Sequence, residues 1–164
     1  MAKVIERSGD AVAAFFDDGY DVFMANTNCH CAFYSPLHQR IQKNIPELYM
    51  VDQQTFHMKP EKKLGSYTTY SFGDPTDEFP IAINLYGQLN FGIGRRHLNY
   101  AALTCSLLNA CGFILDGVDT QRVVKVCLEK IGSAAAGLMQ DDWEIVKEIL
   151  EFCPDRIEFY VYSL

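Results

Sequence analysis

Apolar residues follow two patterns along the chain, and one of them predicts strands. Asp21–Thr27 (DVFMANT) is a continuous, mainly apolar run of strand length, which is typical of a sheet buried on both faces. Arg122–Ile131 alternates instead, with Val124, Val126 and Leu128 expected to face inward and Lys125, Cys127 and Glu129 outward. Including these two, we expect six strands: Lys3–Glu6, Asp21–Thr27, Gly65–Phe72, Pro80–Gly87, Arg122–Ile131 and Arg156–Leu164.

The second pattern has helical spacing and predicts the segments between the strands. Asp10 is placed to cap a first helix, Ser35 reads as the N-cap of a second helix with Pro36 as its first residue, and Pro46 opens a third. His97–Gly112 is the clearest helix, and the last helix covers 141–153. In the clearest helix we expect Gly112 to be the stop and the following residues to form the apolar stripe: Leu98, Ala101, Ala102, Cys105 and Leu108.

Strands that alternate with helices predict the fold class. They imply an α/β fold, a three-layer α/β/α sandwich in which helices cover both faces of a central sheet. The 164 residues fit one domain, 1–164, because the chain shows no internal repeat, linker or low-complexity tract. In such folds, ligands bind at the carboxyl ends of the strands, where helices begin.

Composition and charge narrow the possible partners. An apolar content of 49% indicates a packed globule, and the net charge of −7 argues against nucleic acid because no basic patch stands out. No apolar run approaches the roughly 20 residues that span a bilayer, and the first residues lack a secretory signal. We therefore expect a cytoplasmic protein with no membrane partner; the sequence predicts no oligomeric state.

Six cysteines could suggest disulfides, but a chain without a secretory signal favours reduced, mostly buried thiols. Cys29 and Cys31 flank His30, yet no second Cys/His pair has zinc-finger spacing, so we expect no metal. A nucleophilic pair of Cys29 or Cys31 with His30, His38 or His97 remains an alternative, since spatial proximity cannot be read from adjacency.

Four predicted strand-to-helix junctions could bind an anion. They lie at SGDAV (8–12), NTNCHCAFYSP (26–36), GQLNFGIGRR (87–96) and IGSAAAG (131–137). Each would expose backbone N–H groups near a helix N-terminus, where unsatisfied donors and the helix dipole attract negative charge. A single glycine-rich turn is usually only a turn, but four at one edge of a sheet favour a ligand site.

Several polar side chains in these junctions have two interpretations. Asp10 could accept hydrogen bonds from a ligand amine or simply cap a helix, and Asn28 could hold a hydroxyl or make a turn. Arg95 and Arg96 could clamp a phosphate, although a solvated surface position is the simpler interpretation. The aspartates at 141 and 142 most simply complement the N-terminus of the last helix.

Together, the order of these segments resembles the macro domain family, in particular its branch of ADP-ribose-1''-phosphate phosphatases and related phage or bacterial proteins. The likeness spans nearly the whole chain. It is carried by SGDAV (8–12), FMANTNCHCAFYSPLHQRIQKNIPELY (23–49), KKLGSYTTYSF (62–72), INLYGQ (83–88), YAAL (100–103), IGSAAAGLMQDDWEIV (131–146) and FYVYSL (159–164). The resemblance implies a macro-domain-like sandwich with a mixed central sheet.

The resemblance also implies a ligand of the ADP-ribose class, without a cofactor or a metal. Asp10 would bind the adenine amine, Ala11 would make a backbone contact there, and Asn28 would hold the distal ribose as the candidate catalytic residue. Two loops would bind the phosphates through main-chain donors. Their residues are Tyr34, Ser35, Pro36 and Leu37 in the first, and Ile131, Gly132, Ser133, Ala134, Ala135, Ala136 and Gly137 in the second.

The chain departs from the family pattern in ways that leave two functions open. Tyr34-Ser35-Pro36 replaces a Gly-x-Gly turn, Ala25 replaces a histidine of phosphatase-like members, and Ala134 replaces a loop glycine. The first function is ADP-ribose binding, with or without hydrolysis of a 1''-phosphate or an ADP-ribosyl ester. The alternative is an inactive macro-fold protein whose pocket is closed or repurposed, acting through protein contact or another ligand.

Overall fold

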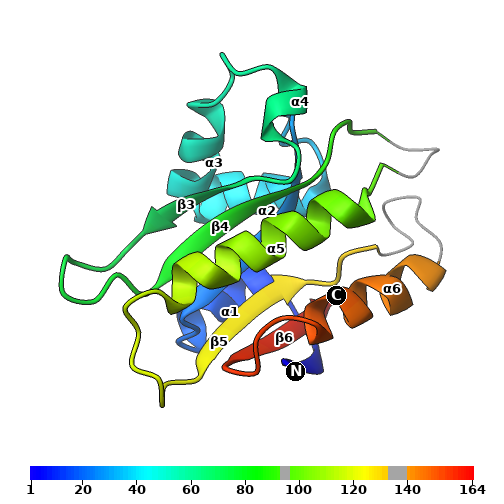
Figure 1. Cartoon of the computed structure of the whole chain (residues 1–164). Helices are drawn as coiled ribbons and strands as arrows, with labels where there is room; N and C mark the ends of the chain where they lie inside the picture. The colour runs from blue at the N-terminus through cyan, green and yellow to red at the C-terminus, as the bar shows by residue number, and fades with distance from the viewer. Residues whose placement is uncertain (93–96, 133–139) are drawn as a thin grey trace.

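The computed structural model describes residues 1–92, 97–132 and 140–164 (Figure 1). These residues form a six-stranded sheet with the order β1-β6-β5-β2-β4-β3. The strands are β1 (Lys3–Ser8), β2 (Val22–Asn28), β3 (Tyr67–Ser71), β4 (Ile81–Gln88), β5 (Val124–Glu129) and β6 (Ile157–Ser163). Each of the six predicted strands is therefore confirmed, with shifts of a few residues at the ends.

The sheet is mixed, as the family resemblance implied. Along the order β1-β6-β5-β2-β4, all neighbouring strands pair in parallel. The edge strand β3 pairs antiparallel with β4. Because β1, β2, β4, β5 and β6 share one direction, their carboxyl ends meet at the same edge of the sheet.

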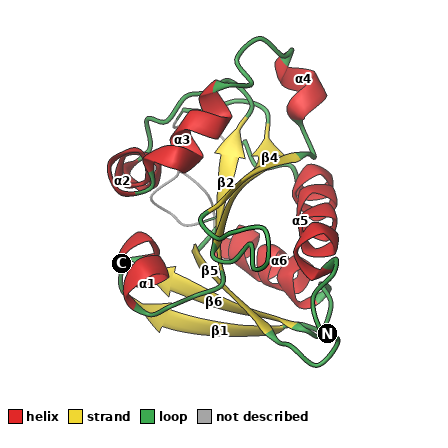
Figure 2. Ribbon diagram, turned by 90° about the vertical axis from the view of Figure 1, so that its left-hand side faces the viewer, coloured by secondary structure: helices red, strands yellow, loops and turns green. Residues whose placement is uncertain are grey.

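Helices cover both faces of the sheet, which confirms the three-layer α/β/α sandwich (Figure 2). Residues of α1, α2 and α3 pack on one face and residues of α5 and α6 on the other. The helices are α1 (Ala11–Asp17), α2 (Pro36–Asn44), α3 (Pro46–Gln53), α4 (Pro60–Lys63), α5 (Tyr100–Leu115) and α6 (Gln140–Glu151). The short helix α4 was not predicted. Among the described residues, no helix is both long and apolar enough for a membrane crossing.

The sheet separates two apolar cores, and β2 contributes to both. Val22 and Met24 pack towards α5 and α6, whereas Phe23 and Ala25 pack towards α1 and α2. Val22, Phe23 and Met24 are fully buried. A strand covered on both faces has no polar side, and this explains the continuous apolar run in the sequence.

Local capping follows the sequence closely. Ser35 is the N-cap of α2, where its Oγ accepts the N–H of His38 at 3.1 Å, and Pro36 is the first helical residue. Asp10 caps α1 by accepting the N–H of Val12 at 2.9 Å. These bonds satisfy donors that the first turn of a helix leaves without an internal partner.

Three expectations about burial and helix ends were wrong. Cys127 was expected to face outward, but it is fully buried because helices cover that face as well. Gly112 does not stop α5, which continues to Leu115. The predicted stripe is wrong at Ala101, Cys105 and Leu108, which are exposed, whereas Leu98 and Ala102 are buried as expected. The helix instead buries Ala102, Leu103, Ser106, Leu107, Ala110, Cys111 and Ile114.

Candidate functional site

The predicted site lies where two neighbouring strands send the chain to opposite faces of the sheet. β2 and β5 pair directly, with Phe23 opposite Cys127. β2 leads to α2 on one face, whereas β5 leads to α6 on the other. A reversal of this kind opens a crevice between the two following loops, and ligands of open α/β sheets bind in such crevices. The residues after β1 and β4 belong to the same edge.

Asp10 sits at this edge and already has two partners. One carboxylate oxygen, Oδ1, accepts the N–H of Val12 and lies 2.7 Å from Nη1 of Arg40. The other end of the guanidinium hydrogen-bonds Glu129 at the end of β5. Ala11 follows as the first residue of α1 and is fully buried, and its backbone contact with a ligand stays a prediction. Sequence reasoning did not find Arg40.

Asn28 ends β2, and its side chain shapes the loop that follows. Its Nδ2 donates to the carbonyl of Ala32 at 2.7 Å, and its Oδ1 accepts the N–H of His30 at 2.9 Å. The side chain is also 4% exposed. The turn-making role considered for Asn28 is therefore present in the structure, and its contact with a ribose stays a prediction.

The tyrosine of the first predicted phosphate loop lies exposed at the surface. Tyr34 is 69% exposed, and its ring meets the edge of Phe91 at a centroid distance of 5.5 Å. Pro36 occupies the first position of α2. A residue there has no hydrogen-bond acceptor for its N–H within the helix, so proline loses no bond. Ser35 is committed to capping, and Leu37 packs partly against the core.

The second predicted loop is described only at its start. Ile131 is buried in the core beneath α6, so its side chain is structural. Gly132 has φ +84, and a Cβ there would lie 3.2 Å from Cβ of Asp142 and 3.4 Å from N of Trp143. Both facts require glycine at this position. The predicted residues Ser133, Ala134, Ala135, Ala136 and Gly137 lie outside the described residues, as do Arg95 and Arg96.

Asp142 belongs to the first turn of α6, as expected for a residue that complements the helix N-terminus. It is also buried, and it accepts a hydrogen bond from the hydroxyl of Tyr100 at the start of α5. This bond joins the two helices that cover one face of the sheet.

The two cysteines of the loop after β2, Cys29 and Cys31, have different partners. Sγ of Cys29 donates to the carbonyl of Gln88 at 3.3 Å, and burial raises the pKa of this thiol to about 11. Sγ of Cys31 lies 3.4 Å from Nζ of Lys63. Neither thiol bonds a histidine, so these contacts give no support to a Cys/His nucleophile. Within 1–92, 97–132 and 140–164, no three His, Cys, Asp or Glu side chains gather as a metal site needs.

A chain of buried polar groups runs beneath α2 and α3, and sequence reasoning missed it. Nε2 of His38 lies 3.2 Å from Oγ1 of Thr27, which donates to Oδ1 of Asn84 at 3.2 Å. Burial lowers the pKa of His38 to about 4, so this ring is neutral at pH 7. The polar Asn84 inside the apolar run INLY was the available signal.

A second buried group continues this polar layer towards α4. The hydroxyl of Tyr86 donates to Oδ1 of Asp52 at 2.7 Å, and Nζ of Lys63 lies 3.7 Å from the same oxygen. Burial raises the pKa of Asp52, although the tyrosine and the lysine act in the opposite direction. All three residues are almost completely buried.

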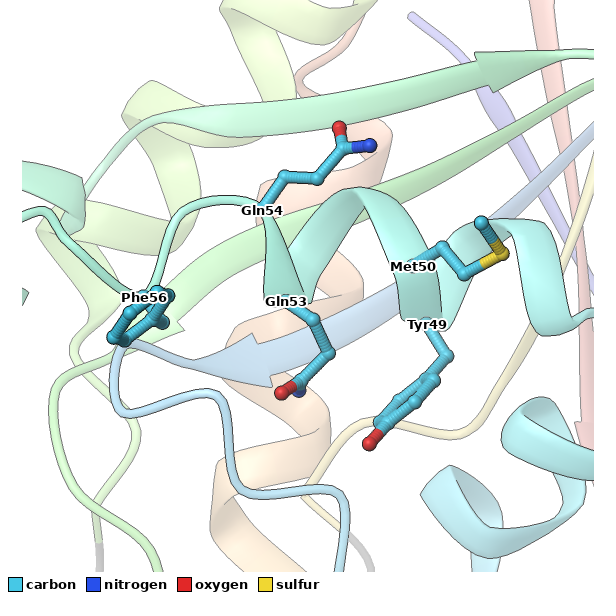
Figure 3. A pocket seen from close by; sticks show the side chains of 5 residues that line it. All are labelled: Tyr49, Met50, Gln53, Gln54 and Phe56. Atoms are coloured by element: carbon cyan, nitrogen blue, oxygen red, sulfur yellow. The ribbon is translucent and has the colours of Figure 1, made fainter.

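A hollow with a volume of about 360 Å³ lies on α3, where Gln53 and Tyr49 also contact Cys31 and Phe33 of the loop after β2 (Figure 3). It is lined by Tyr49, Met50, Gln53, Gln54 and Phe56. Tyr49 and Gln53 point to one side of the helix, and Met50 and Gln54 to the other (Figure 3). None of these residues was predicted to bind a ligand, and no described contact says what would occupy the hollow.

Comparison with known proteins relates this architecture to solved structures. No family model matches the chain, and no curated protein sequence matches it. The macrodomain of Mycobacterium tuberculosis DarG is similar at 14% identity, with a TM-score of 0.72 over 100% of this chain and 99% of that chain. A macrodomain protein from Streptomyces coelicolor is similar at 16% identity, with a TM-score of 0.71 over 99% of each chain.

A third structure of this kind carries a ligand. Thermosipho africanus DarTG in complex with ADP-ribose is 13% identical, with a TM-score of 0.67 over 98% of this chain and 42% of that chain. At these identities the likeness concerns architecture, which agrees with the mixed sheet and the two helical layers described above. The chain therefore has the macrodomain fold.

Proposed function

We propose that the chain binds ADP-ribose or an ADP-ribose derivative between the loops that follow β2 and β5. The observation that carries this proposal is the reversal at β2 and β5, which directs α2 and α6 to opposite faces. Thermosipho africanus DarTG, 42% of whose chain is covered by this fold, was solved in complex with ADP-ribose. The net charge of −7 argues against a nucleic-acid partner, whereas main-chain N–H groups can bind a small anion whatever the net charge.

Each end of the ligand would meet a different part of this edge. Asp10 and the backbone of Ala11 would bind the adenine, because a carboxylate accepts hydrogen bonds from an exocyclic amine. Asn28 would orient the distal ribose. The diphosphate would lie between Tyr34–Leu37 and the loop from Ile131 to Gly137, where main-chain N–H groups bind phosphate oxygens without any need for a lysine.

Two side chains would have to share or release their present hydrogen-bond partners when the ligand binds. Asp10 would share its carboxylate between Arg40 and the adenine amine, which is feasible because a carboxylate has about four acceptor positions. Asn28 would release Ala32 or use its remaining acceptor capacity for a ribose hydroxyl. Hydrolysis of a 1''-phosphate or an ADP-ribosyl ester would be an extension of this binding, with Asn28 positioning the distal ribose.

Titration calorimetry with ADP-ribose tests the proposal. We expect a saturable signal in the micromolar to submillimolar range, and AMP should bind more weakly because it lacks the distal ribose. Asp10→Ala should weaken binding about tenfold, the effect of one lost charged hydrogen bond. A flat trace at millimolar ADP-ribose contradicts the proposal.

The closed-pocket alternative is favoured by one observation, the prior engagement of Asp10 and Asn28. In that case the chain would act through protein contact or another ligand. Replacing Tyr34-Ser35-Pro36 with Gly-Ser-Gly distinguishes the two. Binding of ADP-ribose by this variant but not by the natural chain supports the alternative, whereas equal or weaker binding by the variant supports an open site.

A further inference from the structure

A buried lysine lies beneath the loop that follows β2, and its close partner is a thiol. The Lys63 side chain is 1% exposed, and its Nζ lies 3.4 Å from Sγ of Cys31. Oδ1 of Asp52 is farther away, at 3.7 Å, and already accepts the hydroxyl of Tyr86. Buried ammonium groups are normally held by several oxygen acceptors, and sulfur is a weak acceptor. The ring of Tyr86 lies 4.6 Å from Nζ, so the buried ammonium is held by one ring, one distant carboxylate and a thiol instead of several close oxygen acceptors.

The backbone holds Cys31 in an uncommon conformation towards this lysine. Its φ is +56, which no other non-glycine residue adopts among the described residues. The carbonyl of Cys31 accepts a hydrogen bond from Nε2 of Gln53 at 3.0 Å, and Sγ donates to the carbonyl of Asp52 at 3.3 Å. A left-handed conformation costs about 1 kcal/mol or more for a residue with a Cβ, so these contacts must hold the thiol in place. The side chain is only half-buried, which leaves a path for a small oxidant.

We propose that Cys31 and Lys63 form an oxidative cross-link in which one oxygen atom joins Sγ to Nζ. One molecule of dioxygen supplies the reaction. The S–H bond, one N–H bond and the O–O bond break, an S–O bond and an O–N bond form, and the second oxygen leaves as water with the two hydrogens. The sulfur and the nitrogen each lose two electrons, and dioxygen takes up four.

The neighbouring groups suit this chemistry. Nζ needs a lone pair to bond oxygen, and the carboxylate of Asp52, 3.7 Å away, can accept the proton that the ammonium loses. Burial raises the pKa of Asp52, which favours its protonated form. Oγ1 of Thr55 lies 3.7 Å from Sγ, and its hydroxyl, which donates to the carbonyl of Asp52 at 2.6 Å, would have to turn to hydrogen-bond the added oxygen.

The same chain provides two internal controls. Cys29 lies two residues away in the same loop but is buried, and the described hydrogen bond of its thiol goes to the carbonyl of Gln88 and not to an amine. Cys105 on α5 is exposed. If burial or exposure alone decided oxidation, one of these thiols would react as Cys31 does. The cross-link would instead be specific to Cys31 and would join the loop after β2 to α4.

Intact-mass spectrometry tests the proposal on the whole chain, purified with a reductant and then exposed to oxygenated buffer. We expect a gain of about 14 Da, the mass of one oxygen less two hydrogens, which a thiol reductant reverses. Proteolysis without reductant should yield one linked peptide that contains Cys31 and Lys63. Cys31→Ser should abolish the gain, whereas Cys29→Ser and Cys105→Ser should keep it.

Several results would overturn the proposal. These are an unchanged mass, a gain of about 16 or 32 Da on Cys31 without a linked peptide, and a linked peptide that lacks the added oxygen. Persistence of the gain in Cys31→Ser would overturn it as well. Lys63→Arg keeps the positive charge without a primary amine and should lose the link. If that variant does not fold, the linked peptide of the natural chain decides the question alone.

Discussion

Arg40 holds Asp10 through an ion pair of 2.7 Å between Nη1 and Oδ1, so the residue expected to meet an adenine amine is engaged before any ligand arrives. The same guanidinium hydrogen-bonds Glu129 at the end of β5. Arg40 therefore links α1, α2 and β5 at one end of the proposed site. In the proposed site, the affinity for ADP-ribose would therefore depend on a residue that is outside the predicted contact set.

We predict that Arg40→Met binds ADP-ribose several-fold more tightly while it lowers the free energy of unfolding by about 1 kcal/mol. Asp10 becomes free for the ligand, and the loss of stability stays small because the pair is 23% and 34% exposed and partly screened by water. Calorimetry and urea unfolding measure the two effects. Arg40→Lys, which keeps a positive charge, is the control. Weaker binding by Arg40→Met would mean that the arginine itself contacts the ligand.

Alanine substitutions at three glycines can distinguish the cost of backbone strain from the cost of a close contact. Gly132 has φ +84 and faces Cβ of Asp142, whereas Gly117 has φ +74 with nothing within 4 Å of an added Cβ. Gly117→Ala should therefore cost about 1 kcal/mol from the left-handed conformation alone, and Gly132→Ala about 2 kcal/mol or more. Gly112 lies inside α5 with open space around it, so Gly112→Ala should add about 0.5–1 kcal/mol.

Urea unfolding of the three alanine variants provides this measurement. A loss of stability in Gly112→Ala would contradict the continuation of α5 through this position. Equal losses in Gly117→Ala and Gly132→Ala would mean that contact with α6 adds nothing to the strain.

Stability should fall in mild acid because of His38. Burial lowers its pKa from 6.5 to about 4, so the unfolded chain binds a proton that the folded chain does not. The contribution of the neutral His38 ring to stability is therefore fully present above pH 6.5. As the pH falls towards 4, the free energy of unfolding declines by up to about 3 kcal/mol. Unfolding free energies between pH 4 and 7 measure the slope. His38→Gln should reduce it, and the exposed His57→Gln should leave it unchanged; equal slopes in all three proteins would contradict this role.

The sequence predicts elements well where a local signal fixes them. Ser35 and Pro36 define the start of α2 because an acceptor side chain and a fixed φ suit the first turn of a helix. The prediction that Cys127 faces outward was wrong because the alternation of apolar and polar residues in β5 implied one solvent-exposed face. Nothing in the local sequence shows that α1 packs on that face. Gly112 was taken for a stop, yet the packing of Ile114 in the core carries α5 past it.

The site was harder to predict because its contacts join residues far apart in the chain. The positions of Asp10 and Asn28 at the carboxyl edge follow from the order of strands. Their partners do not, since Arg40 is 30 residues from Asp10 and 89 from Glu129. Lys63 was also missed, because a lysine in a charged stretch normally points to water. Only the folded chain shows that it is buried beside Asp52.

Asn28 should be required both for the loop and for the ligand, and two variants can separate these roles. Asn28→Ala removes the bonds to Ala32 and His30, so it should lower the free energy of unfolding by about 2 kcal/mol and abolish ADP-ribose binding. Asn28→Asp keeps the acceptor for the N–H of His30 but sets a carboxylate oxygen against the carbonyl of Ala32, which lies 2.7 Å from the present donor. Protonation restores a donor there, so Asn28→Asp should gain stability relative to Asn28→Ala as the pH falls from 7 to 4. Urea unfolding across this range measures the difference, and a constant difference would show that the bond to Ala32 contributes little.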